Sequence, residues 1–240
     1  MKPESAKQLT ERAADQIIQL ILDRNMTPGE RLPNESELAK MLGIGRSTLR
    51  EAIRSLESRN VLTVRQGSGT YVSDKKGVPD DPLGLTLLYG RDGGAALGLD
   101  LVEIRLLLEP EVAAMAAARI QPQQKKELLR RHRAVLETIY NADSSDDHMA
   151  AEVRYHGYIA ECCGNSALTN LIPVINASIS MAISTWDEDL KRQAAEQHTT
   201  LTNAICRQDT QGAKYAMIVH LNTSREYFIH RKAREQEGEA

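Results

Sequence analysis

Residues 35–72 constrain the fold of this chain more than any other stretch of its sequence. Apolar side chains recur at helical spacing from Glu35 to Leu42, which predicts a short helix. Gly43 and Gly45 then interrupt the pattern, because each glycine costs a helix roughly 1 kcal/mol relative to alanine. A second helix is expected from about Ser47 to Ser58, with its apolar residues on one side. The pattern therefore predicts two short helices joined by a tight turn.

The second of these helices carries arginines on a face of its own. Arg46, Arg50 and Arg54 follow one another at intervals of four residues, so their side chains lie on one side of the helix. Two β-prone runs, 61–64 and 70–72, then flank the glycine-bearing segment 66–69, which predicts a hairpin. Together these elements predict a winged helix-turn-helix whose arginine helix enters a DNA major groove. The alternative is that the three arginines form an ordinary solvated face.

The same residues resemble the DNA-binding domain of the GntR family. The matching segments are 28–35, 38–39, 45–52 and 65–72. The resemblance implies that Arg46 and Arg50 read an operator, while Gly67 in the wing lies in the minor groove. We expect the full set of DNA contacts to be Arg46, Ser47, Thr48, Arg50, Arg54, Gln66 and Gly67. The family usually has an arginine where this chain has Ser36, so one DNA contact of the family is expected to be missing.

The charge of the chain is distributed unevenly. The net charge is −3, but residues 40–76 contain eight Lys or Arg against three acidic residues, so this segment carries +5 and the remainder −8. Such a chain is expected to touch DNA with one small face rather than to coat nucleic acid or an anionic membrane. No apolar run approaches the ~20 residues that a membrane span needs, and the N-terminus does not resemble a signal peptide. The three cysteines lack the spacing of a disulfide framework. We therefore expect a cytoplasmic protein with reduced thiols.

The remaining sequence predicts a second, all-helical domain. We expect a DNA-binding domain at 1–74, a proline-containing linker at 75–94 and a helical domain at 95–240, with a short helix near 83–89 inside the linker. The helices of the last domain are expected at about 96–118, 122–141, 146–162, 167–186, 188–207 and 210–233. Pro110 should kink or divide the first, and Pro173 should kink the fourth. The predicted fold is thus mainly α: a winged helix-turn-helix followed by an antiparallel helical bundle.

Four residues of this helical domain form a candidate metal site. Glu152 and His156 lie four apart on one predicted helix, so both side chains project from the same face. His198 and His220 flank a predicted turn near Gln208 at similar distances, which puts them at nearly equal height on neighbouring helices. One carboxylate and three imidazoles suit zinc or another divalent metal. For any single histidine, a hydrogen-bonded core or surface role is the alternative.

The other three histidines, His132, His148 and His230, lie in polar, charged stretches and are expected to be solvated.

The helical domain also resembles the effector domain of the FadR branch of the family, known as the FCD domain. The matching pieces are 103–105, 108–111, 155–156 with 164–165, 198 and 220–221. The resemblance implies a ligand-binding and dimerising domain, in which metal-binding members use aspartate where this chain has Glu152. It also implies that Arg105 lines the effector cavity, where we expect it to bind a carboxylate. The alternative is an internal ion pair of Arg105 with Glu103 or Glu109.

These expectations combine into one functional hypothesis and two alternatives. The hypothesis is a homodimeric regulator, acting as a repressor on a palindromic operator and released by a small carboxylate, such as a sugar acid or hydroxy acid, at a zinc site. The first alternative is a zinc enzyme, for which Glu161 or Glu196 could act as the acid or base. The second is a DNA-binding protein whose helical domain only dimerises.

Overall fold

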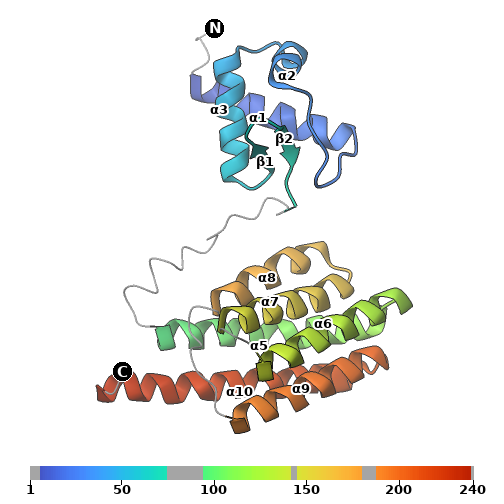
Figure 1. The fold of residues 1–240 in the computed structure, drawn as a ribbon, viewed down its shortest axis with the longest axis vertical. Coiled ribbons are helices and arrows are strands. Elements are labelled where there is room, and N and C mark those ends of the chain that lie inside the picture. The colour runs from blue at the N-terminus through green and yellow to red at the C-terminus, as the bar shows by residue number, and fades with distance from the viewer. Residues whose placement is uncertain (1–5, 75–93, 142–144, 180–187, 239–240) are drawn as a thin grey trace. The chain divides into compact units, whose positions relative to one another are not determined.

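The computed structural model describes residues 6–74, 94–141, 145–179 and 188–238. The chain divides into two compact units, Met1–Pro82 and Leu83–Ala240, which we describe separately (Figure 1). The short helix expected near 83–89 and almost all of the expected linker lie outside the described residues.

The first unit is three helices and a hairpin. Its elements are α1 (Ala6–Asp23), α2 (Glu35–Leu42), α3 (Arg46–Ser58), β1 (Leu62–Arg65) and β2 (Gly69–Val72). The two strands pair antiparallel, with Leu62 opposite Val72 and Arg65 opposite Gly69. A small core holds the unit together, and its fully buried large side chains are Ile17, Leu38, Leu49, Leu56 and Leu62. The winged helix-turn-helix predicted from the sequence is confirmed.

Local signals in the sequence set the ends of α2. The Asn34 side chain accepts from the backbone of Glu37, whose own carboxylate accepts from the backbone of Asn34, so two free N–H groups at the helix start are satisfied. Gly43 ends the helix in the left-handed conformation at φ 66°, which favours glycine. The helix therefore stops where the turn to α3 must begin.

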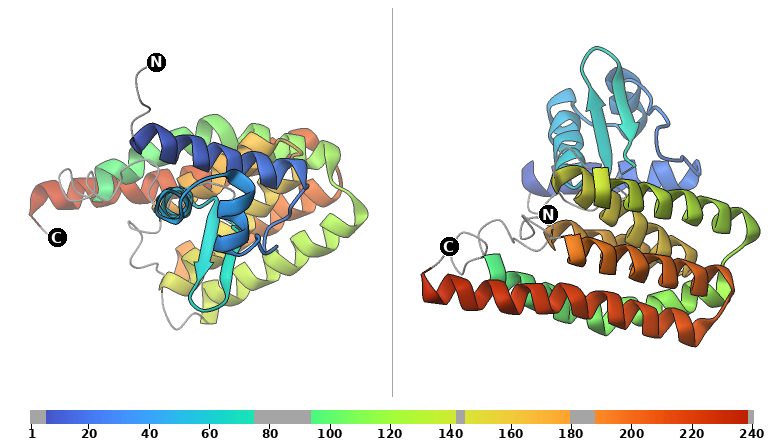
Figure 2. Two further views of the ribbon diagram at one scale, coloured as in Figure 1. Left: turned by 90° about the horizontal axis from the view of Figure 1, so that it is seen from above. Right: turned by 60° about the horizontal axis from the view of Figure 1, so that its bottom comes forward.

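The second unit consists of long helices that lie side by side in Figures 1 and 2. They are α5 (Gly94–Arg119), α6 (Pro122–Asn141), α7 (Ser145–Cys162), α8 (Ser166–Ile179), α9 (Glu188–Cys206) and α10 (Thr210–Glu237). The longest, α10, packs along α5 and α9, while α7 packs against α5, α6 and α8. The predicted mainly helical fold is confirmed. Among the described residues, no helix combines the length and apolar character needed to cross a bilayer.

The two prolines inside these helices do not divide them. Pro110 lies within α5 and Pro173 within α8, and each helix runs on past its proline. Division at Pro110, one of the two outcomes expected from the sequence, is therefore wrong. The end of α8, expected near 186, falls beyond Ile179 in a segment outside the described residues.

Candidate metal centre

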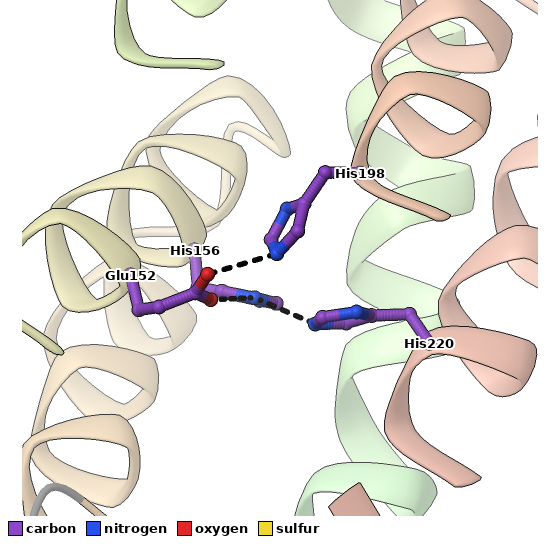
Figure 3. Close-up of side chains that lie close together, drawn as sticks. All are labelled: Glu152, His156, His198 and His220. Carbon is purple, nitrogen blue, oxygen red and sulfur yellow. Dashed lines mark hydrogen bonds and ion pairs between the residues drawn. The ribbon is translucent and has the colours of Figure 1, made fainter. Parts of the chain in front are cut away.

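Glu152, His156, His198 and His220 converge in the interior of the second unit. One ligand atom from each of the four lies within 4.8 Å of the others. Figure 3 shows Glu152 and His156 projecting from one helix, α7, toward His198 of α9 and His220 of α10. The three histidines are buried, with exposed fractions of 1%, 0% and 5% for His156, His198 and His220. The structure thus brings together all four residues expected at the metal site.

The turn between α9 and α10 explains how the last two histidines meet. Asp209 caps α10 by accepting from the backbone N–H of Gly212 at 2.8 Å, so the chain reverses within a few residues. His198 and His220 then come to the same height on adjacent helices, with their ring centroids 4.4 Å apart. The sequence likewise predicted that His198 and His220 lie at nearly equal height on neighbouring helices.

The distances within the cluster match those between ligands of one ion. His198 Nε2 lies 2.8 Å from Glu152 Oε1, His156 Nε2 lies 3.3 Å from Glu152 Oε2, and the Nε2 atoms of His156 and His220 are 3.2 Å apart. Ligands bound tetrahedrally at ~2.0–2.1 Å from a zinc ion are separated by about 3.3 Å. The donor set and its spacing therefore fit a divalent metal with a preference for imidazole.

A second layer of buried charge orients His156. Its Nδ1 lies 2.6 Å from Glu109 Oε2, and Arg105 Nε donates to Glu109 Oε1 at 2.5 Å. Because Nδ1 carries the proton donated to Glu109, the Nε2 lone pair is directed at the cluster. Arg105 is only 6% exposed. Of the two ion-pair partners considered from the sequence, the structure selects Glu109.

Burial and neighbouring charges shift the pKa values of these groups in different directions. Burial alone would raise the pKa of Glu109, but Arg105 and His156 hold it below its usual value. Glu152 likewise keeps a pKa well below the ordinary 4.5 despite its burial, because His198 and His156 stabilise the carboxylate. Burial, with His198 and His156 nearby, holds the pKa of His220 well below 6.5. This imidazole therefore stays neutral, as a metal ligand must be.

His156 differs from His220 in the direction of its shift. Burial would lower its pKa, but the Glu109 carboxylate outweighs this effect, so the pKa of His156 is raised above 6.5. Protons therefore compete with a metal at this imidazole.

Two of the three remaining histidines contradict the sequence-based expectation. His132 and His148 are buried, each 8% exposed, rather than solvated. Each has a hydroxyl partner, Thr199 for His132 and Thr138 for His148, and burial lowers the pKa of both. Their polar neighbours in sequence project away from the helix face that carries the histidine. The third, His230, is exposed as expected.

Two residues at the site were not predicted there from the sequence: Glu109 was considered only as an ion-pair partner of Arg105, and His148 was expected to be solvated. The position of His148 four residues before Glu152 could have indicated that both lie on one helix face, and its Nε2 is 3.6 Å from Glu152 Oε1. Glu161 and Glu196, considered as acid or base for an enzyme, are both exposed.

In the first unit, the residues expected to contact DNA lie on α3 and the hairpin. Arg46, Arg50 and Arg54 are exposed. Arg50 Nε donates to Glu35 at 2.9 Å, and an Arg46 nitrogen lies 3.5 Å from Ser36 Oγ. Ser47 is exposed and Thr48 half-buried at the start of the same helix.

The tip of the hairpin is open around Gln66 and Gly67. Both residues are exposed. Gly67 has φ 71°, and nothing lies within 4 Å of where its Cβ would be. A backbone can therefore approach another molecule closely at this point.

Comparisons with known proteins agree with the architecture of both units. Residues 9–72 match the model of the bacterial regulatory proteins of the gntR family, and residues 100–223 match that of the FCD domain. The Uxu operon transcriptional regulator of Escherichia coli is 30% identical over 235 residues, covering 94% of this chain and 88% of that protein. The putative L-lactate dehydrogenase operon regulatory protein of Escherichia coli is 29% identical over 235 residues, covering 93% and 86%.

A solved structure, that of Streptococcus agalactiae GntR, resembles the chain with a TM-score of 0.77 and 40% identity, covering 91% of this chain and 99% of that one. These relatives and families are regulators of transcription rather than enzymes. The chain therefore belongs to the GntR family of DNA-binding transcriptional regulators, with an FCD domain as its helical unit.

Proposed function

We propose that this regulator senses a small carboxylate at a divalent metal in its helical unit and changes its affinity for DNA in response. The metal, with zinc as the first candidate, would be held by Glu152, His156, His198 and His220. When bound, it would supply a positive charge that attracts a carboxylate oxygen. The observation that carries the proposal is the convergence of three buried histidines and the half-buried Glu152 beside a buried arginine.

The charge balance of the site favours an anion. With neutral imidazoles, Arg105 contributes +1 while Glu109 and Glu152 contribute −1 each, so the buried charges sum to −1. A divalent ion would change this sum to +1, and a buried net charge is costly unless it is compensated. One carboxylate group would neutralise the site. Arg105 donates to Glu109 through Nε, and its other N–H groups can donate to the carboxylate of the effector.

We propose that the operator is a palindrome bound by a homodimer, with one α3 helix reading each half-site. Exposed arginines on α3 support the DNA contact, and a set of exposed apolar side chains on α5 and α10 supports the dimer. Leu107 of α5 is 76% exposed, while Tyr215 and Val219 of α10 are 65% and 55% exposed. The ion pair between Glu111 and Lys214 joins the two helices close to these residues. Apolar side chains gathered at one place commonly mark a protein interface.

We further propose that the protein is a repressor that the carboxylate releases from DNA. For this to occur, the ligand must bind more tightly to the form of the protein that does not fit the operator. The name of the Escherichia coli relative linked to an L-lactate dehydrogenase operon agrees with a small hydroxy acid as the class of ligand.

The test is a thermal-shift screen of small organic acids on the full chain, once loaded with zinc and once with EDTA, followed by DNA binding with every acid that shifts the melting temperature. We expect a shift that requires zinc and weaker binding to an operator selected from random DNA. Metal analysis that finds no zinc after supplementation would contradict the metal site. Shifts that persist unchanged in EDTA would contradict the role of the metal in sensing.

A further inference from the structure

Asn176 of α8 is a buried amide without hydrogen bonds. It is 4% exposed, and neither Nδ2 nor Oδ1 has a partner among the residues that the structure describes. Leaving a buried donor or acceptor unpaired costs about 1–3 kcal/mol, so an amide with both atoms unpaired is unfavourable in an otherwise packed helix. The Asn176 amide therefore has one donor group and one acceptor group with which a bound molecule can pair.

The packing of α8 against α7 gives the height of Asn176 along the bundle. Pro173 of α8 lies 3.4 Å from where a Cβ of Gly157 would be, and the Thr169 hydroxyl donates to the Ala160 carbonyl. Positions on α8 therefore increase as positions on α7 decrease. Continued by one turn, this register places Asn176 beside Val153, between the heights of Glu152 and His156.

The neighbour of Asn176 connects α8 to α5. Ile175 is buried in one cluster with Leu101, Val102 and Met149. Val102 precedes Arg105 by less than one helical turn, and Met149 precedes Glu152 by the same distance. Asn176 thus lies at the level of both the metal cluster and the buried arginine, on a helix that packs against α5 and α7.

The chemistry of an amide narrows the ligand. A plain carboxylate only accepts hydrogen bonds, so it could satisfy Nδ2 but would leave Oδ1 unpaired. A hydroxyl group both donates and accepts, so it can satisfy either atom. Resting on the function proposed above, we propose that Asn176 recognises a hydroxyl group of the effector, which makes the effector a hydroxy acid rather than an unsubstituted carboxylic acid.

The test compares acids that differ only in their hydroxyl groups, namely L-lactate with propionate and D-gluconate with hexanoate, titrated into the zinc-loaded full chain by calorimetry. For at least one pair, the wild type should bind the hydroxy acid at least about tenfold more tightly than its partner, because the analogue without the hydroxyl leaves the amide unpaired. Asn176→Leu, which keeps the branched shape of the side chain but removes both polar atoms, should reduce this ratio to about one. It should leave zinc content unchanged and should not lower the melting temperature of the ligand-free protein.

Asn222→Leu is the matched control, because the Asn222 amide on α10 already donates to the Ile218 carbonyl at 2.9 Å. The Asn222→Leu variant should keep the wild-type ratio of affinities for the hydroxy acid and its analogue. If Asn176→Leu does not fold, Asn176→Ala replaces it, with the same expected loss of preference.

A hydroxyl preference that persists in the Asn176 variants, or a wild type that binds both members of each pair equally, would overturn the role of Asn176 and leave the metal-dependent sensing of carboxylates standing. If none of the four acids binds the zinc-loaded wild type while zinc itself is bound, the assignment of Asn176 falls together with the proposed carboxylate effector.

Discussion

Two carboxylates hold His156 from opposite sides of its ring. Glu109 lies 2.6 Å from Nδ1, while Glu152 lies 3.3 Å from Nε2. The Glu109 contact fixes the tautomer of His156, while the Glu152 contact lies on the side of the ring that faces the cluster. The two acids therefore have different roles. Arg105 keeps Glu109 ionised by lowering its pKa against the effect of burial. At the scale of single residues, the site is therefore organised by charge as much as by its four candidate ligands.

Removing His198 tests whether the cluster binds metal. We expect His198→Ala to lower the zinc content of purified protein well below that of the wild type, because one of four ligands is lost. The response of the His198→Ala variant to organic acids should weaken, while its operator binding without an acid should stay close to that of the wild type. Mass spectrometry of bound metal measures the first effect. His230→Ala, which removes an exposed histidine, is the control and should keep full zinc content.

Metal binding should depend on pH through His156. Its pKa is raised above 6.5, so its contribution to the stability of the metal-free protein is present below pH 6.5 and is lost as pH rises through the raised value. Zinc binding follows the opposite direction, because the ligand must lose its proton first. The difference between melting temperatures with zinc and with EDTA should therefore increase from pH 6 to pH 8. A constant difference would show that no titrating imidazole binds the metal.

The sequence allowed the four candidate metal ligands to be predicted, but not the burial of the other residues near them. The positions of Glu152, His156, His198 and His220 follow from helix geometry and one turn, both of which are local, so the cluster could be anticipated. The burial of His132 and His148 depends on which helix faces pack together, and polar neighbours in sequence carry no information on that. Asn176 gave no signal either, because an asparagine in an apolar helix only becomes unusual once its hydrogen bonds can be counted.

At the scale of elements, the close packing of α5 against α10 depends on the absence of a side chain. A Cβ added to Gly98 of α5 would lie 2.4 Å from the ring of Phe228 on α10, and that ring is fully buried. The two helices can approach one another here because position 98 is a glycine.

Gly98→Ala should therefore destabilise the helical unit, by about 1–3 kcal/mol, although alanine is the better helix former. The thermal unfolding midpoint, measured with metal removed, should fall by several degrees. Gly157→Ala of α7 is the matched control, because its Cβ would meet Pro173 at 3.4 Å, an ordinary contact. This variant should melt at the wild-type temperature or slightly above it. Equal behaviour of the two variants would contradict the packing argument.

The arginine face of α3 leads to a prediction about sequence reading. We expect Arg46→Ala and Arg50→Ala each to remove the preference for the operator over random DNA, because a bidentate contact to a base contributes about 1–3 kcal/mol of discrimination. The fold and zinc content should not change, since both side chains are exposed. Fluorescence anisotropy with operator and scrambled DNA measures the preference. Arg133→Ala, an exposed arginine of α6, removes the same charge and should leave the preference intact.

Most element boundaries could be predicted because breaks in the sequence are local. The predicted helix from 122 to 141 and the hairpin around 66–69 agree with α6, β1 and β2 to within about one residue. Division of α5 at Pro110 was wrong for a physical reason. A proline removes one backbone hydrogen bond, but packing of the helix along α10 continues on both sides of it and keeps the helix continuous.

At the scale of the whole molecule, the exposed apolar side chains of α5 and α10 lead to a prediction about assembly. Leu107→Glu places a charge where we propose that a second copy packs, so the protein should shift from dimer to monomer in size-exclusion chromatography with light scattering. Leu171→Glu of α8 is the control, because Leu171 is also exposed, at 41%, but lies on another helix. A variant at position 107 that remains dimeric would place the dimer contact elsewhere.

The cluster draws its members from α7 and from the α9–α10 hairpin, so an ion held there would tie position 152 to position 220 through the middle of the helical unit. Such a tie resembles a cross-link that closes a long loop of chain and restricts how far the helices can separate when the protein transiently opens. We therefore expect proteases to cleave the chelated protein faster than the loaded one. The lifetime of this regulator in a cell would then follow the supply of metal, in addition to any effect of the effector on DNA.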